Sequence, residues 1–162
     1  MARVEIKALK MLKGSQNVLQ LKEVLETRNS MYIVTELCEK GTLREALTQQ
    51  RKFPEAKAIK ILQEIVQGYR AISQNKLIHR DIKPDNIFLG ADDAVRIGDF
   101  GFAIDAAECV DPCEENVGSP LYMSYEALTG NVYSFKSDLW AIGVTFLEML
   151  TGKTPWKSKT EN

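Results

Sequence analysis

Apolar residues recur at helical spacing over residues 2–13, and Gly14 follows them as a stop signal, so the first predicted element is a helix. The apolar positions of this helix are Val4, Ala8, Leu9 and Leu12. Two β-rich apolar stretches follow at residues 18–25 and 31–37, and the polar turn between them predicts an antiparallel hairpin. Two strands are too few to form a stable sheet alone, so we expect this hairpin to need further partners.

Helical spacing returns after the hairpin. Thr42 followed by Glu45 is a capping-box pattern and predicts a short helix through Leu47. Pro54 then opens a longer helix, because proline is favoured at a helix start. The apolar positions that we expect on one face of this longer helix are Ile59, Leu62, Ile65 or Val66, Tyr69 and Ile72.

The second half of the chain is less regular. Two apolar triplets, residues 87–89 and 95–97, flank a polar turn and predict a second small hairpin. Residues 102–122 have no clear period and many acidic side chains, which is typical of a long functional loop. Strands early in the chain and helices later predict one α+β domain.

The most apolar stretch lies near the end of the chain. We expect Ser137 to cap a helix over residues 138–151, with Gly152 as its end. Its apolar run is interrupted by Glu148 and is too short to span a bilayer.

Composition then narrows the class of protein. The 162 residues contain 21 Lys and Arg against 22 Asp and Glu, a formal net charge of −1 that disfavours nucleic-acid binding. Residues 1–7 lack the apolar core of a secretory signal. We therefore expect a soluble domain in the cytoplasm, with no membrane span and no nucleic-acid partner.

The cysteines agree with a reducing compartment. Cys38, Cys109 and Cys113 cannot all pair with one another, and a disulfide framework needs a denser pattern. Cys109 and Cys113 are spaced C-x₃-C, but a zinc site needs further ligands and His79 is the single histidine. Free thiols are the first expectation, and a disulfide formed under oxidative stress is the second.

Two motifs carry most of the chemical signal. Residues 79–86 read His-Arg-Asp-Ile-Lys-Pro-Asp-Asn, and residues 99–101 read Asp-Phe-Gly. They resemble the catalytic loop and the metal-binding tripeptide of eukaryotic serine/threonine protein kinases. Residues 118–120 and 138–143 resemble the substrate-facing loop and the central buried helix of the same family. Each motif alone is more often an ordinary turn or surface segment, whereas the ordered set indicates a kinase domain.

The resemblance implies a two-lobed protein kinase fold of the α+β class, with a truncated small β lobe and a mostly helical large lobe. Residues 1–37 would be the remnant of the small lobe, and residues 38–162 the large lobe up to its central buried helix. No glycine-rich loop or nucleotide-binding lysine precedes Glu5, and the last helices of the large lobe are missing after Trp156. We therefore expect these 162 residues alone to have little kinase activity and to aggregate or melt broadly.

The resemblance also implies a reaction, the transfer of the γ-phosphoryl group of Mg·ATP to Ser or Thr hydroxyls of proteins. Asp81 is the expected base for the acceptor hydroxyl, and Lys83 the clamp on a γ-phosphate oxygen. Asn86 and Asp99 offer the hard oxygen ligands that Mg²⁺ prefers. Ser119, together with Lys83, favours Ser/Thr over Tyr acceptors.

The nucleotide pocket follows from the same resemblance. Thr35 would guard the back of the pocket, Glu36 and Cys38 would lie in the segment whose backbone binds adenine, and Phe88 would form an apolar floor. Glu5 would pair with the nucleotide-binding lysine, and a solvated helix acid is the alternative.

The resemblance also implies a regulatory role for Arg80, which receives an activation-segment phosphate in the family, but we expect this protein not to need phosphorylation at the usual position. Residues 102–117 contain no Ser, Thr or Tyr, and Glu115 falls where many relatives carry a phosphorylated Thr. A Glu115–Arg80 ion pair is one interpretation, and a solvated acidic loop is the other.

Two rival interpretations stay open at this point. The missing lysine and glycine-rich loop favour a catalytically inactive kinase-like interaction module or an incomplete kinase fragment. The intact Asp81, Asn86 and Asp99 favour an enzyme, because an inactive module has no chemical need for all three. A regulatory partner is not identified by the sequence.

Overall fold

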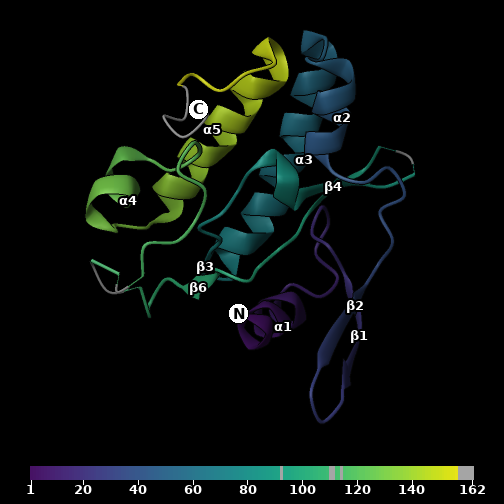
Figure 1. Ribbon diagram of the computed structural model, residues 1–162, viewed down its shortest axis with the longest axis vertical. Helices are drawn as coiled ribbons and strands as arrows, with labels where there is room; N and C mark the ends of the chain where they lie inside the picture. Colours follow the sequence, from purple (N-terminus) through teal and green to yellow (C-terminus); the bar gives the residue numbers. More distant parts are fainter. Residues whose placement is uncertain (92, 110–111, 114, 157–162) are drawn as a thin grey trace.

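The computed structural model describes residues 1–91, 93–109, 112–113 and 115–156, and Figure 1 shows its arrangement. Its helices are α1 (Ala2–Met11), α2 (Leu43–Gln50), α3 (Glu55–Gln74), the short 3₁₀ helix η1 (Pro84–Asn86), α4 (Tyr125–Gly130) and α5 (Phe135–Thr151). Its strands are β1 (Leu21–Glu26), β2 (Met31–Thr35), β3 (Leu77–Ile78), β4 (Ile87–Leu89), β5 (Val95–Ile97) and β6 (Ile104–Asp105). Helices together with short antiparallel strand pairs form an α+β fold, as the sequence predicts.

In the described part of the chain, the strands form three two-stranded sheets. β1 pairs with β2 and β4 pairs with β5, so both predicted hairpins are confirmed. The sequence did not predict the third pair, β3 with β6, because two-residue strands are too short to show a period. A bridge between Val18 and Ile97 joins the segment before β1 to β5. In Figure 1 the β1–β2 hairpin extends away from the helices beside α1.

Helix α3 lies at the centre of the core and contacts α5 and β5. Its buried residues are Ala58, Ile61, Ile65, Gly68, Tyr69 and Ile72. The predicted apolar face was therefore wrong at Ile59, which is exposed, and of the alternatives Ile65 and Val66 it is Ile65 that is buried. The actual face includes Gly68, where a Cβ would lie 2.4 Å from the backbone oxygen of Asn17. A small residue on this face lets the segment of Asn17 approach closely, and an apolar pattern does not reveal that.

The ends of several helices confirm or correct the sequence predictions. The capping box of α2 is present, because Glu45 N donates to Thr42 Oγ1 (3.2 Å) and Thr42 N donates to Glu45 Oε2 (2.8 Å). Helix α5 begins three residues earlier than predicted and is capped by Ser134, with Ser137 as the reciprocal partner of this capping box. Gly152 ends the helix in a left-handed conformation (φ 76°), as expected.

Surface exposure also departs from the expected pattern at two helices. Val4 of α1 is exposed, whereas Ala8, Leu9 and Leu12 are buried as predicted. Helix α5 buries one face only, because Leu139 is 52% exposed and Trp140 is 46% exposed. Within the part of the chain that the structure describes, we find no helix both long enough and apolar enough to cross a membrane.

Candidate active site

One carboxylate of α5 accepts hydrogen bonds from the backbone of the loop at residues 79–86. Asp138 Oδ2 accepts the backbone N–H of His79 (2.7 Å), and Oδ1 accepts that of Arg80 (2.9 Å). The Tyr69 hydroxyl of α3 donates to the same carboxylate over 3.2 Å. Arg80 adopts the left-handed conformation (φ 67°), which is unfavourable for a residue with a side chain. The buried carboxylate therefore fixes a strained backbone immediately before Asp81.

Burial changes the pKa values of Asp138 and of Tyr69, which donates to it. Burial raises the pKa of Asp138, and the hydrogen bonds from the backbone of His79 and Arg80 oppose that shift. Burial also raises the pKa of Tyr69, and the charge of Asp138 adds to the effect. Tyr69 therefore stays a hydroxyl donor to the Asp138 carboxylate.

His79 has a structural role, as the sequence suggests. Its side chain is fully buried, and its ring centroid lies 4.9 Å from that of Phe100. The Asp81 N–H donates to Nδ1 over 3.3 Å, so Nε2 carries the proton and donates to the Gly98 oxygen over 3.1 Å. A neutral imidazole thus connects the loop of Asp81 to the residue that precedes Asp99.

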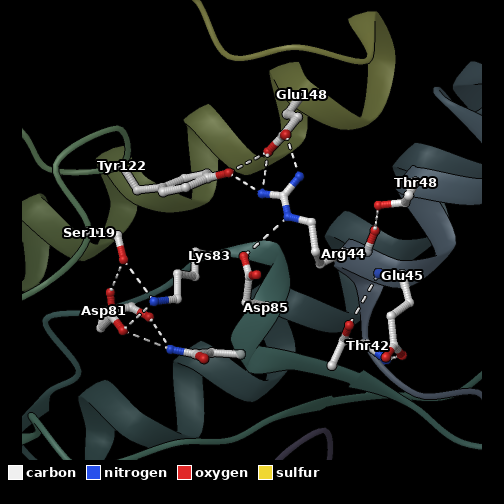
Figure 2. A network of polar contacts seen from close by, with 11 residues as sticks. Thr42, Arg44, Glu45, Thr48, Asp81, Lys83, Asp85, Ser119, Tyr122 and Glu148 are labelled. Carbon is white, nitrogen blue, oxygen red and sulfur yellow. Dashed lines mark hydrogen bonds and ion pairs between the residues drawn. The ribbon is translucent and has the colours of Figure 1, made fainter. Parts of the chain in front are cut away.

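Four of the predicted site residues form one cluster (Figure 2). The Asp81 carboxylate lies 2.9 Å from Lys83 Nζ through Oδ2, and it accepts the Ser119 hydroxyl at Oδ1 over 2.9 Å. Lys83 Nζ also donates to Ser119 Oγ (2.7 Å). Asn86 Nδ2 donates to the backbone oxygen and to Oδ2 of Asp81, both over 2.9 Å. A carboxylate that already accepts a serine hydroxyl next to an ammonium group has the geometry of a proton acceptor.

Asp99 lies next to this cluster. The N–H of Gly98 donates to the backbone oxygen of Asn86 over 2.9 Å, which places the following residue, Asp99, beside Asn86. Asp99 has a left-handed backbone (φ 58°), and the fully buried Phe100 follows it. Burial raises the pKa of Glu5, and the charge of Asp99 raises it further.

The donors at Asn86 and Asp99 suit a hard cation. Within the described part of the chain, both hydrogen bonds of the Asn86 amide use its nitrogen, which leaves the amide oxygen available as a ligand. One amide oxygen and one carboxylate suit Mg²⁺ that arrives with phosphate oxygens as further ligands. Among the described residues, no group of three or more His, Cys, Asp or Glu side chains is placed to hold a metal ion by itself.

The predicted nucleotide-pocket residues lie at the end of β2, in the segment that follows it, and in β4. The Glu36 carboxylate accepts the N–H of Gln20 (2.8 Å) and forms an ion pair with Arg96 (3.3 Å). Its backbone N–H donates to the oxygen of Gln20 over 2.9 Å. Both the side chain and the backbone N–H of Glu36 are therefore engaged within the protein. The Thr35 hydroxyl donates to the backbone oxygen of Glu36 over 3.3 Å.

Two further residues complete this predicted pocket. Burial raises the pKa of Cys38, and the neighbouring charge of Glu36 raises it further, so the thiol stays protonated. The ring of Phe88 packs on Gly98, where an added Cβ would lie 2.8 Å from the ring. Phe88 is thereby next to the residue that precedes Asp99.

Arg80 and Glu115 are not brought together. Arg80 Nε donates to the Phe102 oxygen over 2.7 Å, and its guanidinium lies 5.3 Å from the ring centroid of Tyr133. Glu115 is exposed, and the ion pairs of the described residues do not include one between Glu115 and Arg80. The guanidinium is satisfied by a carbonyl and an aromatic face, so the expected carboxylate partner is not present.

Sequence reasoning missed a second polar network beside the first (Figure 2). Arg44 of α2 donates to Glu148 of α5 (Nη1 to Oε1, 2.6 Å) and to Asp85 of η1 (Nε to Oδ2, 3.2 Å). Arg44 also donates to the Tyr122 hydroxyl, which donates in turn to Glu148 Oε2 over 2.6 Å. Burial alone would lower the pKa of Arg44, but its hydrogen bond with Glu148 and the surrounding charges raise it. The network ties α2 and α5 to the turn after Lys83.

The comparison with known proteins identifies the family. Residues 1–162 match the protein kinase domain, and the chain belongs to that family. It is 34% identical over 163 residues to the serine/threonine-protein kinase atg1 of Dictyostelium discoideum. It is 36% identical over 159 residues to the probable serine/threonine-protein kinase KCC4 of Saccharomyces cerevisiae. A calcium and calcium/calmodulin-dependent serine/threonine-protein kinase of Pisum sativum is 38% identical over 143 residues.

These alignments cover 95%, 98% and 86% of the chain, respectively. The chain spans only 24%, 15% and 27% of the lengths of the same relatives. The fold, the order of the motifs and the match over the whole chain confirm the resemblance drawn from residues 79–86 and 99–101.

Proposed function

We propose that the protein containing this chain is a serine/threonine protein kinase, which transfers the γ-phosphoryl group of Mg·ATP to Ser or Thr hydroxyls of proteins. The observation that carries the proposal is the hydroxyl of Ser119 on Asp81 Oδ1 at 2.9 Å, beside the ammonium of Lys83. This is the arrangement that an acceptor hydroxyl needs, with a base on one side and a cation on the other.

Each residue of the cluster has a separate task in this reaction. Asp81 orients the acceptor hydroxyl and accepts its proton as the oxygen bonds to the γ-phosphorus. The bond from that phosphorus to the bridging oxygen breaks, and ADP leaves. Lys83 balances the negative charge on the transferred group, and Asn86 holds the Asp81 carboxylate in place through its amide nitrogen. Positioning and charge supply most of the catalysis, because phosphoryl transfer needs little covalent help from the protein.

The substrate nucleotide is assigned to the other side of the cluster. Asn86 and Asp99 would bind the Mg²⁺ of Mg·ATP through an amide oxygen and a carboxylate. The backbone of the segment from Glu36 to Cys38 would bind adenine, with Thr35 at the back of the pocket and Phe88 as the floor under the ring. The side chain of Glu36 has no part in this proposal, because it is engaged with Gln20 and Arg96.

The remaining assignments follow from the family. Residues 1–37 would correspond to part of the small lobe and residues 38–162 to part of the large lobe. We assign the protein to the cytoplasm and its acceptors to Ser and Thr residues of other proteins. Glu5 would pair with a nucleotide-binding lysine.

The test uses the full-length protein with γ-labelled ATP, Mg²⁺ and a mixture of Ser-, Thr- and Tyr-containing acceptor peptides. We expect label on Ser and Thr, dependence on Mg²⁺, and loss of transfer in Asp99→Asn. The matched control is Asp93→Asn, since Asp93 lies on an exposed turn and pairs with Lys40 over 3.0 Å. Label on Tyr alone would contradict the acceptor class. Absence of any transfer by a folded full-length protein would favour the inactive interaction module.

A further inference from the structure

Two thiols lie in contact in the acidic loop that follows β6. Cys109 Sγ and Cys113 Sγ are 2.9 Å apart and are hydrogen-bonded. A disulfide bond is about 2.05 Å long, so the sulfur atoms need to approach by only about 0.9 Å to form one. The phosphoryl-transfer site uses neither cysteine.

The protein holds both cysteines in position from the same neighbouring segment. The Cys113 N–H donates to the Asn131 oxygen over 2.9 Å, and Cys109 Sγ lies 3.5 Å from the Tyr133 oxygen. Cys113 is buried in a small apolar cluster with Ile78, Met123, Ala127 and Tyr133, and Cys109 packs on the edge of that cluster. Their proximity is therefore built by packing and backbone contacts.

The described residues around the pair do not form a metal-binding group. Zinc sites use four ligands from Cys, His or carboxylate side chains. Within residues 1–91, 93–109, 112–113 and 115–156, no third His, Cys, Asp or Glu joins the two thiols in such a group.

We propose that Cys109 and Cys113 are a modification site that forms a reversible intramolecular disulfide when a peroxide reaches the protein. Cys109 reacts first, because it is partly exposed whereas Cys113 is only 7% exposed. This inference is independent of the proposed kinase activity, since it needs only the two thiols and their surroundings.

The chemistry balances in two steps. The Cys109 thiolate attacks one oxygen of hydrogen peroxide, the O–O bond breaks, and a sulfenic acid and one water form once the leaving oxygen takes a proton. The sulfur of Cys113 then attacks the Cys109 sulfur, the S–O bond breaks, and hydroxide leaves as a second water with the proton of Cys113. Two thiols are oxidised by two electrons, and one peroxide is reduced to two waters. A dithiol reductant reverses the change by thiol–disulfide exchange.

The disulfide bond would lie next to Tyr133, which contacts the loop that carries Asp81. The Tyr133 hydroxyl accepts the N–H of Val117 (2.8 Å) and donates to its oxygen (2.7 Å), and the Tyr133 ring packs on Arg80. Oxidation therefore cross-links a segment that touches the residue preceding Asp81.

The test is mass spectrometry of the full-length protein after titration with hydrogen peroxide and alkylation of the remaining thiols. No Lys or Arg separates the two cysteines, so trypsin leaves both on the single peptide of residues 97–136. After oxidation, we expect this peptide to carry no alkyl groups and to have the mass of the reduced, unalkylated peptide minus two hydrogens. After treatment with dithiothreitol, both thiols should be alkylated. Cys38 is the internal control, and we expect it to be alkylated at the peroxide dose that oxidises the pair.

Two variants identify the order of the steps. In Cys113→Ser, we expect a sulfenic acid on Cys109 that a 1,3-diketone probe traps. In Cys38→Ser, the disulfide should form as in the wild type. The proposal is overturned if both thiols of the wild-type peptide stay alkylated when Cys38 is already oxidised. It is also overturned if the oxidised pair links two molecules, or if Cys109 accumulates as sulfenic or sulfinic acid while Cys113 stays alkylated.

Discussion

Replacing Asp138 by alanine removes the carboxylate that holds the backbone before Asp81. In the wild type this side chain is 2% exposed and accepts the N–H groups of His79 (2.7 Å) and Arg80 (2.9 Å). Alanine offers no acceptor at this place, so both buried donors lose their partners. Tyr69 is affected less, because its hydroxyl also donates to the Phe135 oxygen over 3.0 Å.

The expected loss follows from these contacts. A buried donor without a partner costs about 1–3 kcal/mol, so two of them lower the free energy of unfolding by about 2–6 kcal/mol. A typical domain has a free energy of unfolding of about 5–15 kcal/mol, so Asp138→Ala removes a large fraction of it. Activity is expected to fall as well, since the left-handed backbone of Arg80 (φ 67°) is no longer held.

The assay is urea unfolding of the wild type, Asp138→Ala, Asp138→Asn and Tyr69→Phe under identical conditions. Asp138→Asn keeps one acceptor oxygen, so its loss should be smaller than that of the alanine variant. Tyr69→Phe removes one neutral donor and should cost about 0.5–1.5 kcal/mol. If Asp138→Ala destabilises the protein no more than Tyr69→Phe, with an unchanged slope, the argument that this carboxylate supports the loop is refuted.

Three further predictions concern other parts of the structure. Arg44→Met leaves Glu148, which is 7% exposed, without its cation and should cost up to about 3–5 kcal/mol in urea unfolding. Arg44→Met with Glu148→Leu should recover part of that loss, and a further loss would contradict the ion-pair argument. The raised pKa of Glu5 means that its stabilising contribution is full below pH 4.5 and lost as pH rises through the folded pKa. In thermal melts of the 162-residue chain, Glu5→Gln should therefore be more stable than the wild type at pH 7 and equal to it below pH 4.5; equal melts at pH 7 would contradict this. Gly98→Ala should lose stability and activity, because the added Cβ would lie 2.8 Å from the Phe88 ring. The control Gly143→Ala, where nothing lies within 4 Å of the added Cβ, should lose neither. Equal effects of the two substitutions would contradict this prediction.

Local sequence patterns predicted the elements that have a period or a cap of their own. The two hairpins and the capping box at Thr42 are confirmed, because cross-strand alternation and an N3 acid are short-range signals. Helix α4 and the β3–β6 pair were not predicted, since six helical residues or two paired residues are too few to show a pattern. Ser137 was assigned as the cap of the last helix, but Ser134 has the extended backbone that a cap requires.

The family motifs named the residues of the candidate site, and their roles stay predictions. The structure brings Asp81, Lys83, Asn86 and Ser119 into one cluster. The role of Arg44 was not predicted, because its partner Glu148 is 104 residues away and no local pattern connects them. The sequence left open whether Glu115 pairs with Arg80 or lies in a solvated loop, and in the structure Arg80 is engaged with the Phe102 oxygen and the Tyr133 ring.

The most direct test of the proposed phosphoryl-transfer site is the kcat and the KM for ATP of the full-length protein, wild type against Asp81→Asn, with a Ser-containing acceptor. Asparagine keeps the size of the side chain but does not accept the proton. We predict that kcat falls by about 10²–10⁴-fold while the KM for ATP changes little, because Asp81 acts on the acceptor hydroxyl and the nucleotide is bound elsewhere. An Asp81→Asn protein that phosphorylates the acceptor with the wild-type kcat would contradict the assignment of Asp81 and the site built around it.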